Sequence, residues 1–142
     1  MRFMMIVKAT PESEAGVLPS SEDIAVMSRY NEELIAAGIL LAAEGLHASK
    51  TGVRARKEDG KVVLTDGPFA ETKELIAGFW LIDVKSRDEA LEWLKRIPFF
   101  DGMEVELRKV HEASDFPVDE VSEEHLRKEA EWRAANQRPI GS

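Results

Sequence analysis

Residues 76–84 read IAGFWLIDV, and this stretch decides the fold class. Successive side chains of an extended chain point to opposite sides, so Trp80 and Ile82 share one face. Phe79 and Leu81 share the other face, which is therefore apolar as well. We predict a strand whose sheet needs cover from water on both sides.

The flanking elements can be placed from their own start and stop residues. Ser86 followed by Glu89 has the pattern of a capping box, and Pro98 ends the helix that it opens. Residues 58–60, Glu-Asp-Gly, are typical of a hairpin turn. The other predicted elements are a strand over 3–8, a helix from Ser20 or Ser21 to Gly38, a strand over 39–43, hairpin strands over 53–57 and 61–65, and a strand over 103–110.

The order of these elements is strand-helix-strand, hairpin, strand-helix-strand. This order predicts an α+β fold, the ferredoxin-like split βαβ arrangement with an inserted hairpin and an antiparallel sheet. Two helices can cover only one face of that sheet. A second subunit packed sheet to sheet would cover the other face, so we expect a homodimer.

Residues 113–142 differ in character from residues 1–112, which we take as the domain proper. The extension is acidic, and Ser122 is a suitable cap for a helix from Glu123 to about Asn136. Leu126, Ala130 and Ala134 form only a thin apolar stripe on that helix. Such a helix is too polar to fold alone, so we expect it to dock on the domain or across the dimer; a lid over a pocket is the alternative.

Composition excludes several functions. The net charge is −8, which argues against direct nucleic-acid binding. The chain has no cysteine, and its three histidines are too scattered to predict a metal site. The apolar N-terminal stretch is too short to span a membrane and lacks the features of a signal peptide. We therefore expect a cytoplasmic protein with no metal, no cofactor and no membrane partner.

Residues 66–74 read DGPFAETKE, directly before the strand quoted above. This motif, together with residues 8–10 (KAT) and 41–46 (LAAEGL), resembles the DGPF-type proteins of the YCII-related superfamily over residues 1–112. The resemblance implies a dimeric α/β-barrel-like fold, similar to muconolactone isomerases and small cofactor-free monooxygenases. It also implies a frequent association with extracytoplasmic-function sigma factors. It implies no particular reaction.

One feature of other YCII relatives is missing from this chain. Those relatives carry a histidine in the first helix that pairs with an aspartate after the second helix. Residues 21–29 contain no histidine here, and Met27 stands near its expected place. Asp101 lies close to the expected position of the aspartate. We therefore infer no hydrolase or dehalogenase activity from that pair.

Three carboxylates are our candidates for acid–base catalysis: Asp66, Glu71 and Glu44. Asp66 and Glu71 belong to the motif, and Glu44 follows the second predicted strand. A carboxylate that points into an apolar cleft loses hydration, and this loss raises its pKa. Such a group can serve as a general acid or base. The structural alternative for Asp66 is an Asx turn in which it accepts bonds from downstream amides.

Five further residues are assigned to ligand binding: His47, Phe69, Thr72, Lys73 and Trp80. His47 can pair with Asp66, and Lys73 can orient an anionic substrate. The alternatives are a surface position for His47 and Lys73 and an anchoring role for Phe69. Two functions remain open: a small-molecule acid–base enzyme, or a non-catalytic ligand-binding or regulatory module linked to sigma-factor-associated transcription control.

Overall fold

In the computed structural model, strand β5 (Ile76–Asp83) occupies an interior position of a four-stranded antiparallel sheet. The structure describes residues 1–71 and 74–142, and within these ranges the side chains of all residues except 120 and 121. The sheet order is β2-β5-β1-β6. The other elements are β1 (Arg2–Lys8), α1 (Pro11–Glu14), α2 (Ser21–Ala36), β2 (Leu40–Gly45), η1 (Ser49–Thr51), β3 (Val53–Glu58), β4 (Lys61–Asp66), α3 (Arg87–Lys95), β6 (Val105–Lys109), η3 (Ala113–Asp115) and α4 (Glu120–Asn136).

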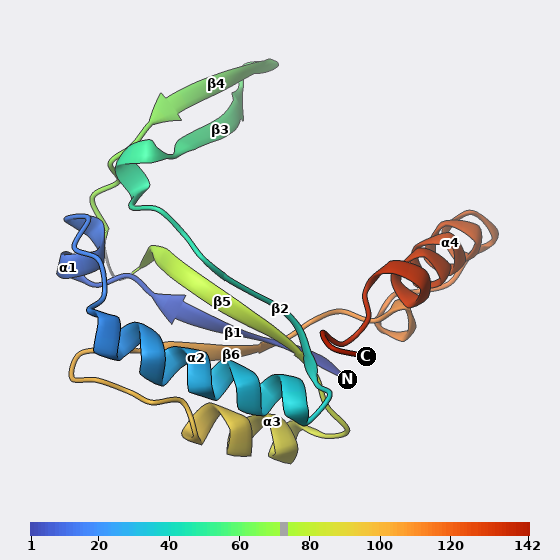
Figure 1. Ribbon diagram of the computed structural model, residues 1–142. Helices are drawn as coiled ribbons and strands as arrows, with labels where there is room; N and C mark the ends of the chain where they lie inside the picture. Colours follow the sequence, from blue (N-terminus) through green and yellow to red (C-terminus); the bar gives the residue numbers. More distant parts are fainter. Residues whose placement is uncertain (72–73) are drawn as a thin grey trace.

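This topology confirms the predicted fold class. With the hairpin set aside, the strand order is that of the ferredoxin-like split βαβ arrangement, with the first strand between the third and the fourth. Helices α2 and α3 lie on the same side of the sheet (Figure 1). The core lies between these helices and the sheet, and its largest fully buried side chains are Met5, Leu34, Leu40 and Ile82.

The helix starts follow from the capping residues. Ser20 accepts a hydrogen bond from the Asp23 amide at the start of α2, and Ser86 accepts one from the Glu89 amide at the start of α3. The Glu89 carboxylate accepts from the Lys85 amide. Gly38 has a φ of +71°, which lets the chain turn sharply after α2 and enter β2.

Aromatic residues on the helix side of the sheet are tied together by hydrogen bonds. The Trp80 indole N–H donates to Asn31 Oδ1 at 2.7 Å, and the Tyr30 hydroxyl donates to the Trp93 carbonyl at 2.7 Å. The Tyr30 and Trp80 rings meet edge to face with centroids 5.5 Å apart. Burial raises the pKa of the Tyr30 hydroxyl, so this group remains a neutral donor.

The predicted hairpin forms a sheet of its own. Strands β3 and β4 pair only with each other among the described residues, and every position in both strands is exposed. Asp59 and Gly60 at the tip have positive φ angles of 47° and 78°, as a tight hairpin turn requires. Figure 1 shows the hairpin projecting from one end of the main sheet.

The C-terminal helix departs from its predicted start. Helix α4 begins at Glu120, and Asp119 is its cap rather than Ser122. The Ser122 amide donates to Asp119 Oδ1 at 2.8 Å, while Ser122 Oγ accepts from the Asp119 amide at 3.0 Å. The prediction was wrong because both residues are good caps and the earlier one begins the helix. Within the described residues, no helix is long and apolar enough to cross a bilayer.

Candidate functional site

The side of the main sheet away from α2 and α3, here called the open face, has an apolar centre. Its central side chains are Met4 and Ile6 from β1 and Phe79 and Leu81 from β5. Strand pairing sets two rows across the face: Ala42, Leu81, Met4 and Arg108, then Glu44, Phe79, Ile6 and Glu106. The charged side chains therefore stand on the two edge strands, and the apolar ones stand between them.

Glu44 reaches the open face because of an irregularity in β2. Simple alternation from the buried Leu40 would place Glu44 on the helix side. The pairing of β2 with β5 shifts between Leu40 and Ala42, so that Ala43 packs against the core. Glu44 then lies opposite Phe79 on the open face, where its side chain is exposed.

At the hairpin end of the sheet, Ser49 joins three segments of the chain. Its amide donates to Glu14 Oε2 at 2.8 Å, and its hydroxyl donates to the other carboxylate oxygen of Glu14. The same hydroxyl oxygen accepts from the Phe69 amide at 3.0 Å. The hydroxyl and amide bonds from Ser49 lower the pKa of Glu14, because they stabilise its charged form. Sequence reasoning assigned no role to Glu14 or Ser49.

The glycine of the 66–74 motif is required by close packing on Ser49. A Cβ atom at Gly67 would lie 1.8 Å from the Ser49 carbonyl oxygen, so no other residue fits without movement of the backbone. The Gly67 amide donates to the Gly52 carbonyl at 2.9 Å, and the Gly52 amide donates to the Ser49 carbonyl at 2.8 Å. These contacts close the base of the hairpin. The Gly67–Pro68 peptide bond is cis.

Phe69 anchors the motif to the hairpin. Its ring is half-buried, and the Arg54 guanidinium carbon lies 3.8 Å above the ring centroid. The backbone of Phe69 is fixed by the bond from its amide to Ser49, and its ring is fixed by the contact with Arg54. This geometry supports the anchoring alternative, and ligand contact by Phe69 stays a prediction.

The three candidate catalytic carboxylates are not brought into contact with one another. Asp66 ends β4, Glu71 lies in the following loop and Glu44 lies near the end of β2; all three are exposed. Among the residues that the structure describes, none of these side chains makes a hydrogen bond or ion pair with another. Nor does the Asp66 carboxylate accept an amide bond there, so the Asx turn is not observed. Their catalytic roles stay predictions.

The remaining binding candidates fall into different surroundings. His47 is exposed, and within the described part of the chain no bond joins it to Asp66. Trp80 is 5% exposed and belongs to the core on the helix side. Its indole N–H, the sole donor of the side chain, is bound to Asn31. Thr72 and Lys73 lie outside the described residues. Their roles in binding stay predictions.

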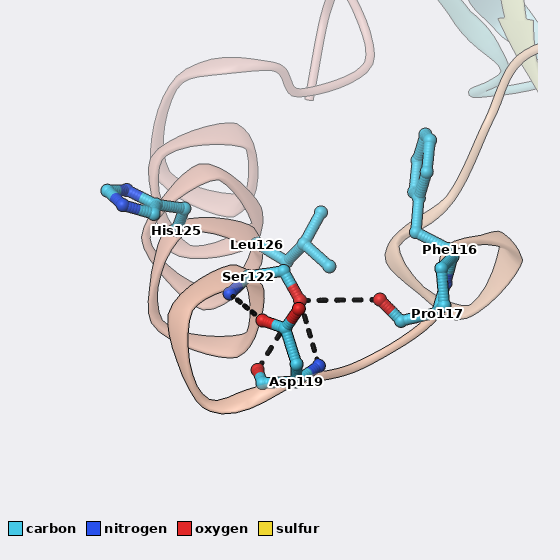
Figure 2. Close-up of a pocket in the computed structure, with 6 residues that line it drawn as sticks. All are labelled: Phe116, Pro117, Asp119, Ser122, His125 and Leu126. Atoms are coloured by element: carbon cyan, nitrogen blue, oxygen red, sulfur yellow. Dashed lines mark hydrogen bonds between the residues drawn. The ribbon is translucent and has the colours of Figure 1, made fainter.

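A cavity of about 520 Å³ lies beside the first turn of α4. Figure 2 shows its lining residues: Phe116, Pro117, Asp119, Ser122, His125 and Leu126. Ser122 and Asp119 bind each other's amides, and Ser122 Oγ also donates to the Pro117 carbonyl at 3.3 Å. The polar atoms of Asp119 and Ser122 thus serve to start the helix.

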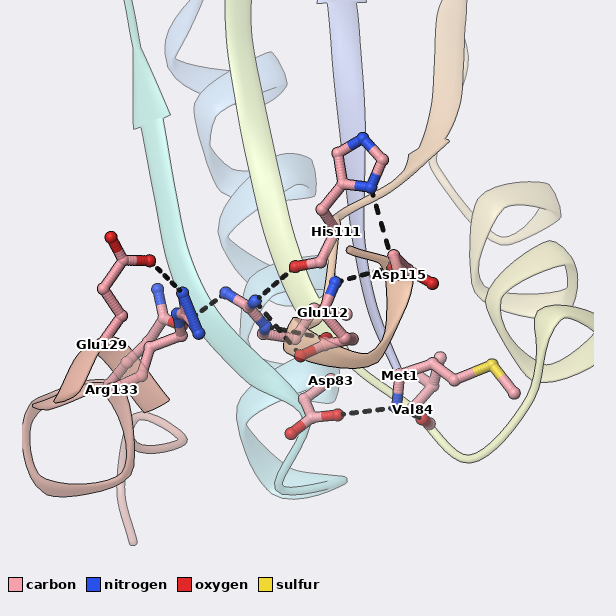
Figure 3. A network of polar contacts seen from close by, with 10 residues as sticks. Met1, Asp83, Val84, His111, Glu112, Asp115, Glu129 and Arg133 are labelled. Carbon is pink, nitrogen blue, oxygen red and sulfur yellow. Dashed lines mark hydrogen bonds and ion pairs between the residues drawn. The ribbon is translucent and has the colours of Figure 1, made fainter. Parts of the chain in front are cut away.

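The C-terminal segment is joined to the sheet through Arg2. Arg2 Nε donates to Glu112 Oε1 at 3.1 Å, and the guanidinium also binds the His111 carbonyl and Gln137 Oε1, each at 3.0 Å. Figure 3 shows His111 and Glu112 within this network of polar contacts. Beyond this point the Ile140 amide donates to the Leu40 carbonyl at 2.7 Å. These bonds attach the extension to the chain's own domain at both of its ends. Across the described residues, no three His, Asp or Glu side chains are grouped as metal ligands would be.

Similarity to known proteins identifies the family of this chain but assigns it no reaction. The model of the YCII-related domain matches residues 1–114. A relative, the uncharacterized protein R00369 of Rhizobium meliloti (strain 1021), is 37% identical over 87 residues, which are 59% of this chain and 70% of that protein. A solved structure, 5-chloro-2-hydroxyhydroquinone dehydrochlorinase (TftG) of Burkholderia phenoliruptrix AC1100 in complex with 2,5-dihydroxybenzoquinone, aligns with 22% identity and a TM-score of 0.40, covering 78% of this chain and 95% of that one. At this distance no reaction is transferred from it.

Proposed function

Because the chain belongs to the YCII-related family, we propose that it acts as a homodimer that binds a small organic molecule between the open faces of its two subunits. The observation that carries this proposal is the apolar centre of the open face. Met4, Ile6 and Phe79 belong to the two central strands and are nevertheless only half-buried. Apolar side chains in such a position are normally covered, and α2 and α3 both lie on the opposite side.

The arrangement of the open face suits a second copy of the same surface. Stable interfaces have an apolar centre and a polar rim. Here the rim is formed on one edge by Glu44 and on the other by Glu106 and Arg108, whose side chains are 3.2 Å apart in an ion pair. A two-fold axis through the face would place apolar centre on apolar centre, as a self-complementary interface requires.

Acid–base catalysis is a second candidate function, and the position of Glu44 favours it. Glu44 shares its row with Phe79 and Ile6, so its carboxylate would stand beside the seam of the dimer. A carboxylate at the border of a dry, apolar cleft can serve as a general acid or base. Asp66 and Glu71 lie near the base of the hairpin, at one end of the main sheet. They could therefore contribute only to that end of such a cleft. Ligand binding without catalysis remains the function that the geometry supports best.

The test combines a mass measurement with a ligand screen. Light scattering after size-exclusion chromatography should give the mass of two chains at micromolar concentration, and a monomer would overturn the dimer. A thermal-shift screen of small organic acids, phenols and ketones should yield a compound that raises the Tm of the wild type. We expect Glu44→Gln to remain dimeric but to lose most of that shift. A compound that stabilises wild type, Glu44→Gln and Asp66→Asn equally would remove both carboxylates from the site.

A further inference from the structure

A second cavity lies on the helix side of the main sheet, between α3 and strands β1 and β6. Its volume is about 470 Å³, within the range of small-molecule sites. Its lining residues are Met1, Phe3, Arg87, Leu91, Leu107 and Lys109. We propose that this cavity binds a small organic anion that has an apolar body, held by Arg87 and Lys109.

The apolar walls come from elements that are fixed in the core. Phe3 is only 3% exposed, and Leu107 packs against the same core cluster. Leu91 stands on α3, one turn after Arg87. These three residues stand on regular elements, whereas Met1, which also lines the cavity, precedes β1 and is 51% exposed. An aliphatic or aromatic ligand body would replace water against these walls.

The two cations are placed so that one anion can reach both. Lys109 lies directly opposite Phe3 in the pairing of β6 with β1, so its side chain leaves the sheet on the helix side. Arg87 is the first residue of α3, at the border of the same cavity. A guanidinium can bind a carboxylate through two parallel hydrogen bonds, and an ammonium can add a third.

Arg87 and Lys109 also lack the carboxylate partners that several other cations of this chain have. Arg2, Arg56, Arg96 and Arg108 each form an ion pair with a glutamate. In the described part of the chain, the side chains of Arg87 and Lys109 form no ion pair and no hydrogen bond. The chain as a whole is strongly acidic, with a net charge of −8, so acids are not scarce. These two exposed cations at one apolar cavity are therefore available to an external anion.

Acidic groups do lie around the cavity, but none lines it. Lys109 helps to lower the pKa of Asp115, although the largest cause is the hydrogen bond that Asp115 accepts from the Glu112 amide. Asp88 and Glu89 share the first turn of α3, and Glu89 is engaged by the Lys85 amide. Arg87 is the first residue of α3, so its positive charge is repelled by the positive end of the helix dipole. A bound anion would offset this repulsion.

This site is independent of the proposed dimer seam. Phe3 and Lys109 form a cross-strand pair that faces the helices. The adjacent pair on the same two strands, Met4 and Arg108, faces the open side. Packing of two open faces would leave the cavity accessible. The anion site can therefore fail while the dimer stands, and the reverse also holds.

The experiment uses 2-naphthoate as the probe, with the full chain labelled with nitrogen-15. We expect fast-exchange shifts of the Phe3, Leu91 and Leu107 amides, and a Kd that rises with salt because the contact is charged. The neutral 2-naphthamide has the same body and should bind at least about tenfold more weakly. Arg87→Gln and Lys109→Gln should each raise the Kd for 2-naphthoate by roughly tenfold.

Lys85→Gln is the matched control, because it removes one positive charge close to α3 from a residue that does not line the cavity. It should leave the Kd for 2-naphthoate within about twofold of the wild-type value. Equal binding of 2-naphthoate and 2-naphthamide would overturn the proposal. So would shifts that map to the open face, or equal losses in Lys85→Gln and Arg87→Gln. Absence of shifts up to about 10 mM 2-naphthoate would overturn it as well.

Discussion

The two faces of the main sheet are built from the same strands but differ in how this chain covers them. On the helix side, Ile82 is fully buried and Trp80 has its indole N–H bound to Asn31. On the open side, Phe79 of the same strand and Ile6 of the neighbouring strand β1 remain half-buried. The helix side is thus covered within one chain, whereas the centre of the open side is only partly covered by the described residues.

This difference separates stability from function in the molecule. Substitutions on the helix side should act on folding at every protein concentration. Substitutions on the open side should act on association and on whatever binds in the seam.

The largest effect is expected from Ile82→Ala. The side chain is fully buried on the helix side, and its truncation leaves a cavity in the core. We expect the free energy of unfolding to fall by about 2–5 kcal/mol, with little dependence on protein concentration. Urea denaturation at two concentrations measures this. A loss that vanishes at high protein concentration would show that the helix side also depends on association.

Ile6→Asp should dissociate the dimer without unfolding the subunit. A carboxylate in the centre of the seam would lose its hydration without a partner, so the dimer Kd should rise by about 100-fold or more. Ile24→Asp is the matched control, because Ile24 is 56% exposed on α2, away from the open face. Sedimentation velocity reports both masses. Equal behaviour of the two variants would contradict the seam.

Acid should loosen the base of the hairpin before it unfolds the sheet. The folded pKa of Glu14 is lowered from its ordinary value of 4.5, so the stability that its bonds to Ser49 provide is complete above that value. That stability is lost as the pH falls below 4.5 through the folded pKa. Glu14→Gln should remove this dependence. Amide shifts of residues 49, 67 and 69 in an NMR pH titration give the measurement, and an unchanged titration in Glu14→Gln would refute the assignment.

The smallest effect is expected from Arg2→Gln. Its guanidinium joins β1 to Glu112 and Gln137, so the substitution should release part of the C-terminal segment. Hydrogen exchange of residues 112–137 should accelerate several-fold, while the exchange of β5 stays unchanged. Lys8→Gln serves as a control on the same strand. Equal acceleration in both variants would argue against Arg2 as the connection.

The sequence predicted most of the secondary structure because its signals are local. Alternation in residues 76–84 located β5, serine caps located α2 and α3, and residues 58–60 located the hairpin turn. The α4 start was misplaced because Asp119 and Ser122 are both suitable caps. Local rules decide between such neighbours poorly.

The site was less predictable because its contacts are long-range. Ser49 meets Glu14 across 35 positions of sequence, and neither residue type marks such a contact in advance. The face on which Glu44 stands depends on the shift in β2, which simple alternation would not reveal. Trp80 was assigned to binding, and the structure places it in the core on the helix side of the sheet.

The isolated hairpin also has a practical use. The chain contains no cysteine, so a cysteine at Lys61, on the exposed start of β4, would be the sole thiol in the protein. One fluorophore could then be attached at the tip of the hairpin without contact to the core. Energy transfer between labelled copies would report how far apart the two tips stand, and quenching on ligand addition would report closure around the seam. The absence of cysteine and the exposure of β3 and β4 thus make this chain ready for single-molecule spectroscopy.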